Sequence, residues 1–200
     1  MPEISLKEQQ LRLREEAILK AVNALLAQKG YDAMTVDEVA SAVGLTKPSL
    51  YKHFASKEAL AGAALVRLLD QTLATIAAQP DTLPADERLR AVLRWALQLH
   101  LRGAMPLLPS TRSGLRDSLL KNGAYVDRLQ AVSSALMGWI EQAQREGTLS
   151  AALPPEVILY TLYARTCDPV LEFLQAGGQY EDTQVVELVL ATCFDGLRVR

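Results

Sequence analysis

Apolar residues recur at spacings of three and four along most of this chain, which is typical of helices that bury one face. No segment shows the alternation of polar and apolar residues expected of a strand. Between interruptions by proline and glycine, the pattern predicts helices over residues 11–29, 57–79, 85–101, 122–146, 156–175 and 182–197. For residues 102–121 we expect a short helix and loops, because two glycines and two prolines prevent one long helix. The predicted fold class is all-α.

Two shorter helices are predicted between the first two long ones. Thr35 begins the first of them, with Glu38 at the position where a capping box requires an acid. Gly44 ends this helix, because glycine reaches the backbone angles of a tight turn without steric cost. Thr46 caps the next helix, and Pro48 lies in its first turn, where the missing N–H costs little. This arrangement is a helix-turn-helix.

The second short helix has a cationic outer face. From Val43 to Lys57 the chain contains no Asp or Glu, but it contains Lys47, Lys52 and His53. A short helix with a small, polar, cationic outer face suits the major groove of DNA, which is about 12 Å wide. We therefore expect the helix-turn-helix to bind double-stranded DNA.

The chain as a whole is not basic, which restricts how it can bind DNA. Its 200 residues carry a formal net charge of −2 at pH 7. A protein that coats nucleic acid without selectivity is usually basic overall, so any contact here depends on a local patch. That patch consists of the face between Lys47 and Lys57 and an N-terminal arm with Lys7, Arg12 and Arg14. Its affinity should be modest unless two patches act together.

The sequence contains no evident residues for catalysis, metal binding or a cofactor. It has two histidines, no metal-ligand spacing and no glycine loop that would cradle a phosphate. An enzyme with a helical active-site cavity is an alternative that lacks a convergent acid, base or nucleophile. Cys167 and Cys193 lie in apolar helical contexts and predict buried thiols in a reducing cytoplasm. Because neither a signal peptide nor an apolar run of about 18 residues is present, we expect a cytoplasmic location and no membrane partner.

The last two predicted helices are too apolar to form a free surface. Packing them against the same pair from a second chain would give a four-helix interface with two-fold symmetry. We therefore expect a homodimer. In the alternative interpretation, both helices fill the core of a single subunit.

A further group of residues could line a pocket for a small hydrophobic or aromatic effector. The candidates are Trp95, His100, Met105, Tyr125, Trp139, Tyr163, Arg165, Cys167 and Asp168. Ordinary core packing is the alternative for the aromatic residues, and a partly buried, hydrogen-bonded side chain is the alternative for His100.

Arg165 and Asp168 are charged residues within the most apolar predicted helix. A buried charge must be paired, so they should pair with each other, pair across the dimer or meet a polar ligand group. Pro169 cannot donate to the carbonyl of Arg165, so we expect a kink that leaves this oxygen free. The kink would form one polar wall of a pocket, or else a structural feature of the dimer seam.

Residues 14–60 resemble the N-terminal DNA-binding domain of the TetR family of bacterial transcriptional regulators. The similarity depends on Gly30–Tyr31, on Val43–Gly44–Leu45, and most of all on the run from Ser49 to Phe54 with the Ser56–Lys57–Glu58 that follows it. It covers roughly a quarter of the chain. The resemblance implies an Ω-like homodimer whose C-terminal domains hold effector pockets and pair through their last two helices.

The resemblance also implies a role in DNA binding for individual residues. The implied contact residues are Thr35, Thr46, Lys47, Pro48, Ser49, Tyr51, Lys52, His53 and Lys57. Thr35 and Lys57 would meet phosphates, and the four residues from Thr46 to Ser49 would face base edges. Within that run, Lys47 could donate to guanine O6 or N7. Tyr51, Lys52 and His53 would lie along the DNA backbone.

The same resemblance assigns other positions away from DNA. Leu45, Leu50 and Phe54 are similar to the internal core of the small domain. Asp37 departs from the family pattern, because several relatives carry a basic residue at this point in the helix. A carboxylate there would repel a phosphate.

These expectations combine into one interpretation. We expect a three-helix DNA-binding domain over residues 1–56 and an effector-binding and dimerisation bundle over residues 57–200. The protein would be a ligand-responsive repressor that binds a pseudo-palindromic operator as a homodimer, with recognition helices about 34–36 Å apart. The alternative is a regulator of the same fold that has no small-molecule effector and is controlled by a protein partner. A closed, fully packed C-terminal core would favour that alternative, whereas a cavity would favour an effector.

Overall fold

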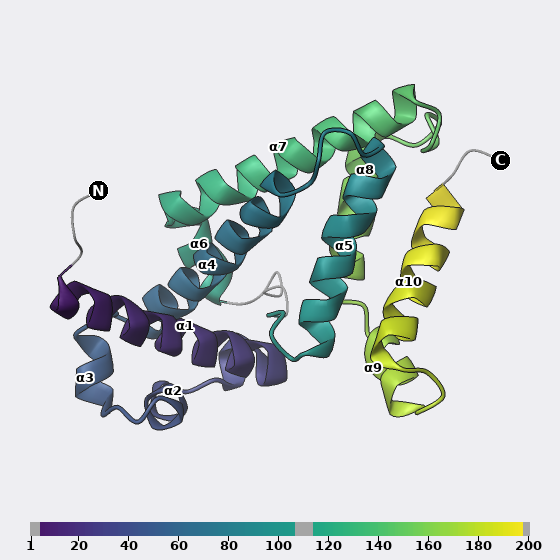
Figure 1. The fold of residues 1–200 in the computed structure, drawn as a ribbon. Helices are drawn as coiled ribbons and strands as arrows, with labels where there is room; N and C mark the ends of the chain where they lie inside the picture. The colour runs from purple at the N-terminus through teal and green to yellow at the C-terminus, as the bar shows by residue number, and fades with distance from the viewer. Residues whose placement is uncertain (1–4, 107–113, 198–200) are drawn as a thin grey trace. The chain divides into compact units, whose positions relative to one another are not determined.

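The computed structural model describes residues 5–106 and 114–197, and these residues form ten α-helices and no strand (Figure 1). The helices are α1 (Leu6–Ala33), α2 (Val36–Ala42), α3 (Lys47–Tyr51), α4 (Lys57–Ala77), α5 (Ala85–Leu101), α6 (Gly114–Lys121), α7 (Gly123–Arg145), α8 (Pro155–Arg165), α9 (Val170–Ala176) and α10 (Asp182–Leu197). The predicted all-α fold class is confirmed. The short helix expected within residues 102–121 is α6, and residues 107–113 of that segment lie outside the described residues.

The chain packs as two compact units. The first unit contains the described residues up to Leu68 and those between Pro106 and Val126, and the second contains those from Leu69 to Met105 and from Asp127 onward. α4 contributes its first turns to the core of the first unit and Ile76 to the core of the second. Because a packing unit is not a functional boundary, the division at residues 56 and 57 stays a prediction.

The first unit is a small helical core around the helix-turn-helix. α2 packs against both α1 and α3, and Figure 1 shows the three helices as a group. Ile18, Val39, Leu50 and Leu60, one from each of α1 to α4, are fully or almost fully buried in this core. Each of these helices thus supplies an apolar face, as the periodicity predicts.

The first helix begins earlier than its apolar stripe indicates. α1 starts at Leu6 rather than near residue 11, because Ser5 and Glu8 form a capping box. Residues 5–14 are all exposed, so this extension has no buried face that apolar spacing could reveal. At its other end the helix breaks as predicted at Gly30, which has a φ of 75°.

The second unit buries apolar residues from α5, α7, α8, α9 and α10 in one core. α10 packs against α5 and α9, and α5 also packs against α8. The single helix predicted over residues 156–175 is instead the two helices α8 and α9. Thr166 caps the end of α8, and Pro169, which has no N–H to continue the helix, precedes α9.

This break corrects one further expectation. The carbonyl oxygen of Arg165 is not free, because it accepts a hydrogen bond from the backbone N–H of Asp168 at 3.4 Å. The chain meets the constraint of Pro169 by forming a tight turn rather than by keeping one kinked helix. The free carbonyl oxygen that was expected to form part of a polar wall is therefore absent at this position.

α4 is long and apolar enough to cross a membrane, by length and composition only, with a mean hydropathy of 1.3 over 18 residues. No apolar run of about 18 residues was predicted from the sequence, and α4 differs from that prediction. The core helix of a soluble protein can be equally long and apolar. Leu60 and Ala64 of α4 are buried in the first unit, and 33% of the apolar stretch is buried inside the protein.

Candidate nucleic-acid interface

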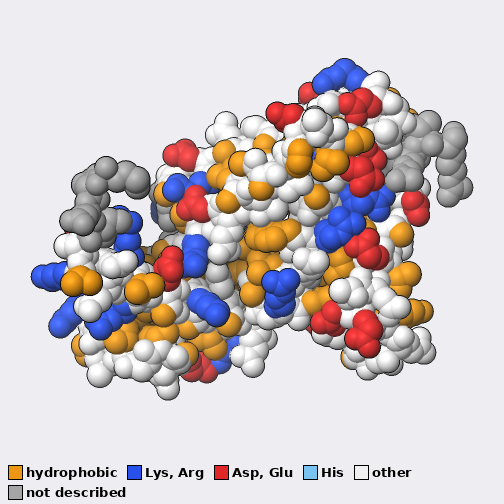
Figure 2. Space-filling model, viewed as in Figure 1, with side chains coloured by type: hydrophobic (Ala, Val, Ile, Leu, Met, Phe, Trp, Pro, Cys, Tyr) orange, Lys and Arg blue, Asp and Glu red, His pale blue; other side chains and the backbone are white. Residues whose placement is uncertain are grey.

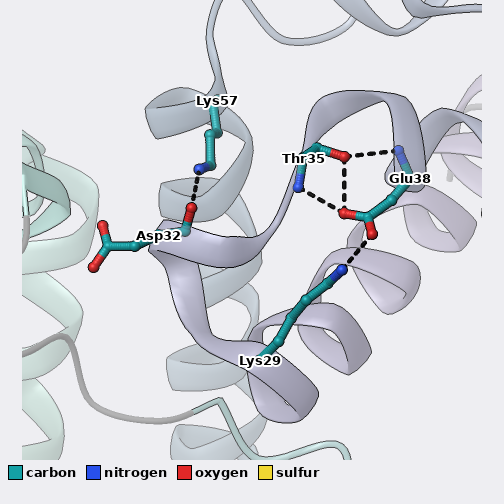
Figure 3. A network of polar contacts seen from close by, with 5 residues as sticks. All are labelled: Lys29, Asp32, Thr35, Glu38 and Lys57. Atoms are coloured by element: carbon teal, nitrogen blue, oxygen red, sulfur yellow. Dashed lines mark hydrogen bonds and ion pairs between the residues drawn. The ribbon is translucent and has the colours of Figure 1, made fainter.

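The start of α2 is held by a network of polar contacts, drawn in Figure 3. Glu38 Oε2 accepts hydrogen bonds from the backbone N–H of Thr35 at 2.9 Å and from its hydroxyl at 2.8 Å. Lys29 of α1 forms an ion pair with the other carboxylate oxygen of Glu38. The hydrogen bond from Lys29, and then those from Thr35, lower the pKa of Glu38 to about 2. Both donors of Thr35 are thus engaged within the protein, and its phosphate contact stays a prediction.

The turn and the recognition helix follow from local sequence. Gly44 adopts a φ of 65° at the end of α2, as predicted for the turn. Thr46 caps α3 by accepting a hydrogen bond from the backbone N–H of Ser49 at 3.4 Å. Leu50 is 1% exposed and anchors the inner face of α3, and Phe54 packs against the same core. The predicted internal positions of α3 are confirmed.

The outer face of α3 is open to solvent. Its exposed residues are Thr46, Lys47, Pro48, Tyr51 and Lys52, whereas Ser49 is half-buried. On the face drawn in Figure 2, Lys and Arg side chains are grouped over the region of α1 and α3. The helix therefore presents small, polar and cationic side chains outward while its apolar side is buried.

Lys47 forms an ion pair with an acid on the neighbouring helix. Its Nζ lies 2.8 Å from Oδ2 of Asp37 in the first turn of α2. The hydrogen bond to Asp37 raises the pKa of Lys47, so the ammonium form is favoured further. Sequence reasoning identified Asp37 as a residue that would repel a phosphate, but it did not identify Lys47 as its partner.

Lys57 lies at the start of α4, against the end of α1. Its Nζ donates to the carbonyl oxygen of Asp32 at 3.4 Å (Figure 3) and lies 4.3 Å from the centre of the Tyr31 ring. The Tyr31 hydroxyl donates to Oε1 of Glu58 at 2.7 Å. Burial, followed by this hydrogen bond, raises the pKa of Tyr31. The aromatic ring and the carbonyl oxygen together hold the ammonium of Lys57 at the start of α4.

His53 turns partly toward the protein. Its side chain is 12% exposed, and its Nδ1 lies 3.7 Å from Oε1 of Glu15 in α1. Because of this contact with α1, the imidazole of His53 is less accessible to DNA than the exposed side chain of Lys52. The phosphate contact of His53 stays a prediction.

The candidate effector residues divide between the two units. Tyr125 packs against the core of the first unit, whereas Trp139 and Tyr163 pack against the core of the second. The guanidinium of Arg88 lies 5.1 Å from the centre of the Trp139 ring, and the Tyr163 hydroxyl lies 2.9 Å from Oγ of Ser133. These partners are those expected of core residues, so the assignment of these three residues to one pocket stays a prediction.

The other candidates belong to the second unit. Trp95 and Cys167 are half-buried, and Met105 is buried. His100 Nδ1 lies 2.9 Å from the carbonyl oxygen of Thr166, so this imidazole links α5 to the turn after α8. This contact fits the alternative given for His100, a partly buried side chain with a hydrogen-bond partner inside the protein.

A pocket of about 440 Å³ lies along the outer face of α8 and is open to solvent. It is lined by Val157, Tyr160, Thr161, Ala164, Arg165 and Asp168. Arg165 and Asp168 form an ion pair with each other, which is one of the arrangements predicted for them. Sequence reasoning missed Val157, Thr161 and Ala164, because apolar spacing does not tell the inner face of an apolar helix from its outer face.

Within residues 5–106 and 114–197, no group of three or more His, Cys, Asp or Glu side chains is arranged to hold a metal ion. Cys193 is buried, and this burial raises the pKa of its thiol. A raised pKa keeps the thiol protonated at neutral pH, as expected of a structural cysteine.

Comparison with known proteins identifies the helix-turn-helix. Residues 18–64 match the family described as "Bacterial regulatory proteins, tetR family". The chain is 26% identical over 193 residues to the uncharacterized HTH-type transcriptional regulator YdeS of Bacillus subtilis, which covers 92% of this chain and 89% of that protein.

Solved structures show the same fold over most of the chain. The fatty acid degradation regulator FadR of Bacillus halodurans has a TM-score of 0.65 at 19% identity, covering 94% of this chain and 97% of that one. The transcriptional regulator FadR of Bacillus subtilis, solved in complex with stearoyl-CoA, has a TM-score of 0.60 at 17% identity, covering 92% and 99%. These relatives are transcriptional regulators rather than enzymes. Residues 18–64 therefore form a DNA-binding helix-turn-helix domain of the tetR family of bacterial regulatory proteins, and the chain is a transcriptional regulator that carries this domain.

Proposed function

We propose that this regulator is a ligand-responsive repressor that binds a pseudo-palindromic DNA operator in the cytoplasm as a homodimer. The observation that carries the proposal is the division of α3 into two faces. Leu50 is buried on one side, while Thr46, Lys47, Pro48, Tyr51 and Lys52 are exposed on the other. A short helix that is anchored from behind and cationic in front suits the major groove of DNA.

The proposed contacts fall into two classes. Thr46, Lys47, Pro48 and Ser49 at the start of α3 read base edges, because this end of a recognition helix enters the groove. The other proposed contacts, with phosphates, are made by Thr35, Tyr51, Lys52, His53 and Lys57. The placement of Lys57 over Tyr31 supports its assignment, because an ammonium fixed beside an aromatic ring is oriented before DNA arrives.

The homodimer is proposed to form through the outer faces of α8 and α10. Val157 and Tyr160 of α8 and Leu188 of α10 are exposed, with 47%, 67% and 43% of their surface accessible. Thr161 and Ala164 lie on the same α8 face and are small enough to allow close approach of a second helix. Pairing two copies would bury these residues and place two recognition helices on one duplex.

The proposed effector is a small hydrophobic or aromatic molecule. The open pocket along α8 is not the proposed site, because the proposed dimer buries its lining residues Val157, Tyr160, Thr161 and Ala164. Elsewhere in the second unit, the half-buried Trp95, Tyr163 and Cys167 are the candidates for the mainly apolar lining that ligand pockets have. The B. subtilis FadR structure, which shares this fold, holds stearoyl-CoA. An effector that binds better to a conformation unable to span both half-sites would release DNA.

Direct selection of DNA tests the core of this proposal. The purified protein is incubated with a randomised duplex of about 30 base pairs, long enough for two half-sites one helical turn apart. We expect enrichment of a sequence with two-fold symmetry, together with a dimer in sedimentation velocity. Recovery of no preferred sequence would contradict the proposal.

A thermal-shift screen separates effector control from control by a protein partner. A ligand that binds only the native state raises the melting temperature, and the rise grows with the ratio of ligand concentration to dissociation constant. We expect apolar compounds with one polar group to raise it and to release the selected duplex. A screen in which no compound does both would favour control by a protein partner.

A further inference from the structure

We propose that Asp37 is a specificity-determining residue that acts through Lys47. This inference rests on the proposed function. Asp37 holds the ammonium of Lys47 at the start of the recognition helix, directs it toward a guanine edge, and lowers the affinity of the helix-turn-helix for DNA of arbitrary sequence.

Asp37 and Lys47 both lie at the N-terminal ends of their helices in the helix-turn-helix. Asp37 lies in the first turn of α2 and Lys47 is the first residue of α3, so the ion pair joins the two helices across the turn. The side chains are 67% and 46% exposed, so both remain accessible to a DNA molecule. Sequence comparison alone makes Asp37 a departure from the family pattern, whereas the structure gives it a partner among the proposed base-reading residues.

The hydrogen-bonding capacity of the ammonium explains how such a pair can select a base. Lysine has three N–H donors, and an ionised aspartate only accepts. One donor is bonded to Oδ2 of Asp37 at 2.8 Å, which leaves two for other acceptors. Guanine presents two acceptors, N7 and O6, on its major-groove edge. Lys47 can therefore donate to guanine without leaving Asp37.

Binding of Lys47 to a phosphate affects the ion pair with Asp37 differently. Exposed ion pairs are weak, so the pair can open when Lys47 moves toward the DNA backbone. The carboxylate of Asp37 then remains unpaired beside a polyanion, which is unfavourable. Binding through phosphates alone is therefore penalised, while binding that keeps the pair intact is not. A difference of this kind raises the ratio of specific to non-specific affinity.

The test compares Asp37→Asn with the wild type on two probes, the duplex selected by the wild-type protein and the unselected random pool. Fluorescence anisotropy over a salt series gives affinity and salt dependence. We expect the variant to bind the pool about threefold to tenfold more tightly, with a log–log salt slope steeper by about 0.9 because one more cation meets phosphate. The ratio of the two affinities should fall by a similar factor.

Two further variants separate the proposed mechanism from simple charge repulsion. Asp37→Glu keeps the acceptor and should keep most of the selectivity. In a Lys47→Ala background, Asp37→Asn should leave the affinity ratio nearly unchanged, because the residue through which Asp37 acts is absent. Asp127→Asn, which neutralises an exposed acid of α7, is the matched control and should change neither quantity.

Each other outcome has a defined meaning. If Asp37→Asn leaves the affinity ratio and the slope unchanged while the protein still melts cooperatively, the inference is wrong. If the ratio falls equally with and without Lys47, Asp37 acts only as a local negative charge and the inference is also wrong. If the wild-type protein selects no duplex at all, the proposed function itself fails, and this inference fails with it.

Discussion

The outer faces of α3 and α8 are two exposed helix surfaces with opposite chemistry. α3 presents Lys47, Pro48 and Lys52 to solvent, whereas α8 presents Val157 and Tyr160. Both helices are anchored from behind by fully buried residues, Leu50 in α3 and Ile158 in α8. Similar anchoring therefore supports two different kinds of recognition. The side chains on the outer face decide that one suits a polyanion and the other a second apolar surface.

A charge placed on the α8 face should produce the largest change in DNA binding. We expect Thr161→Asp to dissociate the proposed dimer, because two copies of the acid would meet at a two-fold interface. Loss of the second recognition helix should weaken binding to the selected duplex by about 100-fold or more. Sedimentation velocity and anisotropy measure the two effects. Ala151→Asp, an exposed site outside α8, is the control, and a Thr161→Asp variant that remained dimeric would remove α8 from the interface.

Removal of the α3 anchor should produce the largest change in stability. Leu50→Ala deletes a side chain that is 1% exposed, and we expect it to lower the free energy of unfolding by about 2–5 kcal/mol. Tyr51→Ala, on the exposed side of the same helix, should cost clearly less because it leaves no comparable cavity. Urea denaturation monitored by circular dichroism measures both. Equal losses would mean that the two faces of α3 are not energetically distinct.

Substitutions in the two proposed classes of DNA contact should change different properties of DNA binding, with effects smaller than those above. Lys57→Ala removes a proposed phosphate contact, so it should weaken binding to all sequences and reduce the salt slope by about 0.9. Lys47→Ala should instead change which base is preferred, because it removes a proposed base contact. Anisotropy on the selected duplex and on single-base variants of it distinguishes them. An unchanged slope for Lys57→Ala would contradict its assignment to a phosphate.

The smallest expected effect is a pH dependence at the start of α2. The pKa of Glu38 is about 2 in the folded protein and about 4.5 when unperturbed, so its ionised form favours folding. This stabilisation is complete above pH 4.5 and is lost as the pH falls toward 2. Glu38→Gln should therefore lower the melting temperature at neutral pH and converge with the wild type near pH 2. A difference that did not change with pH would indicate lost packing instead of lost charge.

Local sequence was sufficient to predict the helix-turn-helix. Thr35 with Glu38, Gly44, and Thr46 with Pro48 each act on the backbone within a few residues, and the predicted caps and turn are confirmed. Capping bonds and the left-handed turn depend on residue type more than on distant contacts. The buried side of α3, by contrast, was predicted from the resemblance to the TetR family, which placed Leu50 in the core.

The second unit could be predicted less completely. The segment around Pro169 was expected to kink, but the tertiary structure ends α8 at Arg165 and begins α9 at Val170. Spacing also grouped Tyr125 with residues of the other unit, because aromatic side chains in a core and in a pocket have the same sequence pattern. Which apolar residues face outward depends on how α8, α9 and α10 pack against α5, and this packing has no local signal.

The sequence by itself determined an all-α chain with a helix-turn-helix whose outer face is cationic, because helical periodicity, caps and glycine turns are properties of neighbouring residues. Only the tertiary structure placed Asp37 against Lys47, Lys57 over Tyr31, and Val157 and Tyr160 on the exposed side of α8. Those arrangements join residues from different turns and different helices. Their geometry is decided by the packing of whole elements, since contacts across the chain become fixed only when the helices meet.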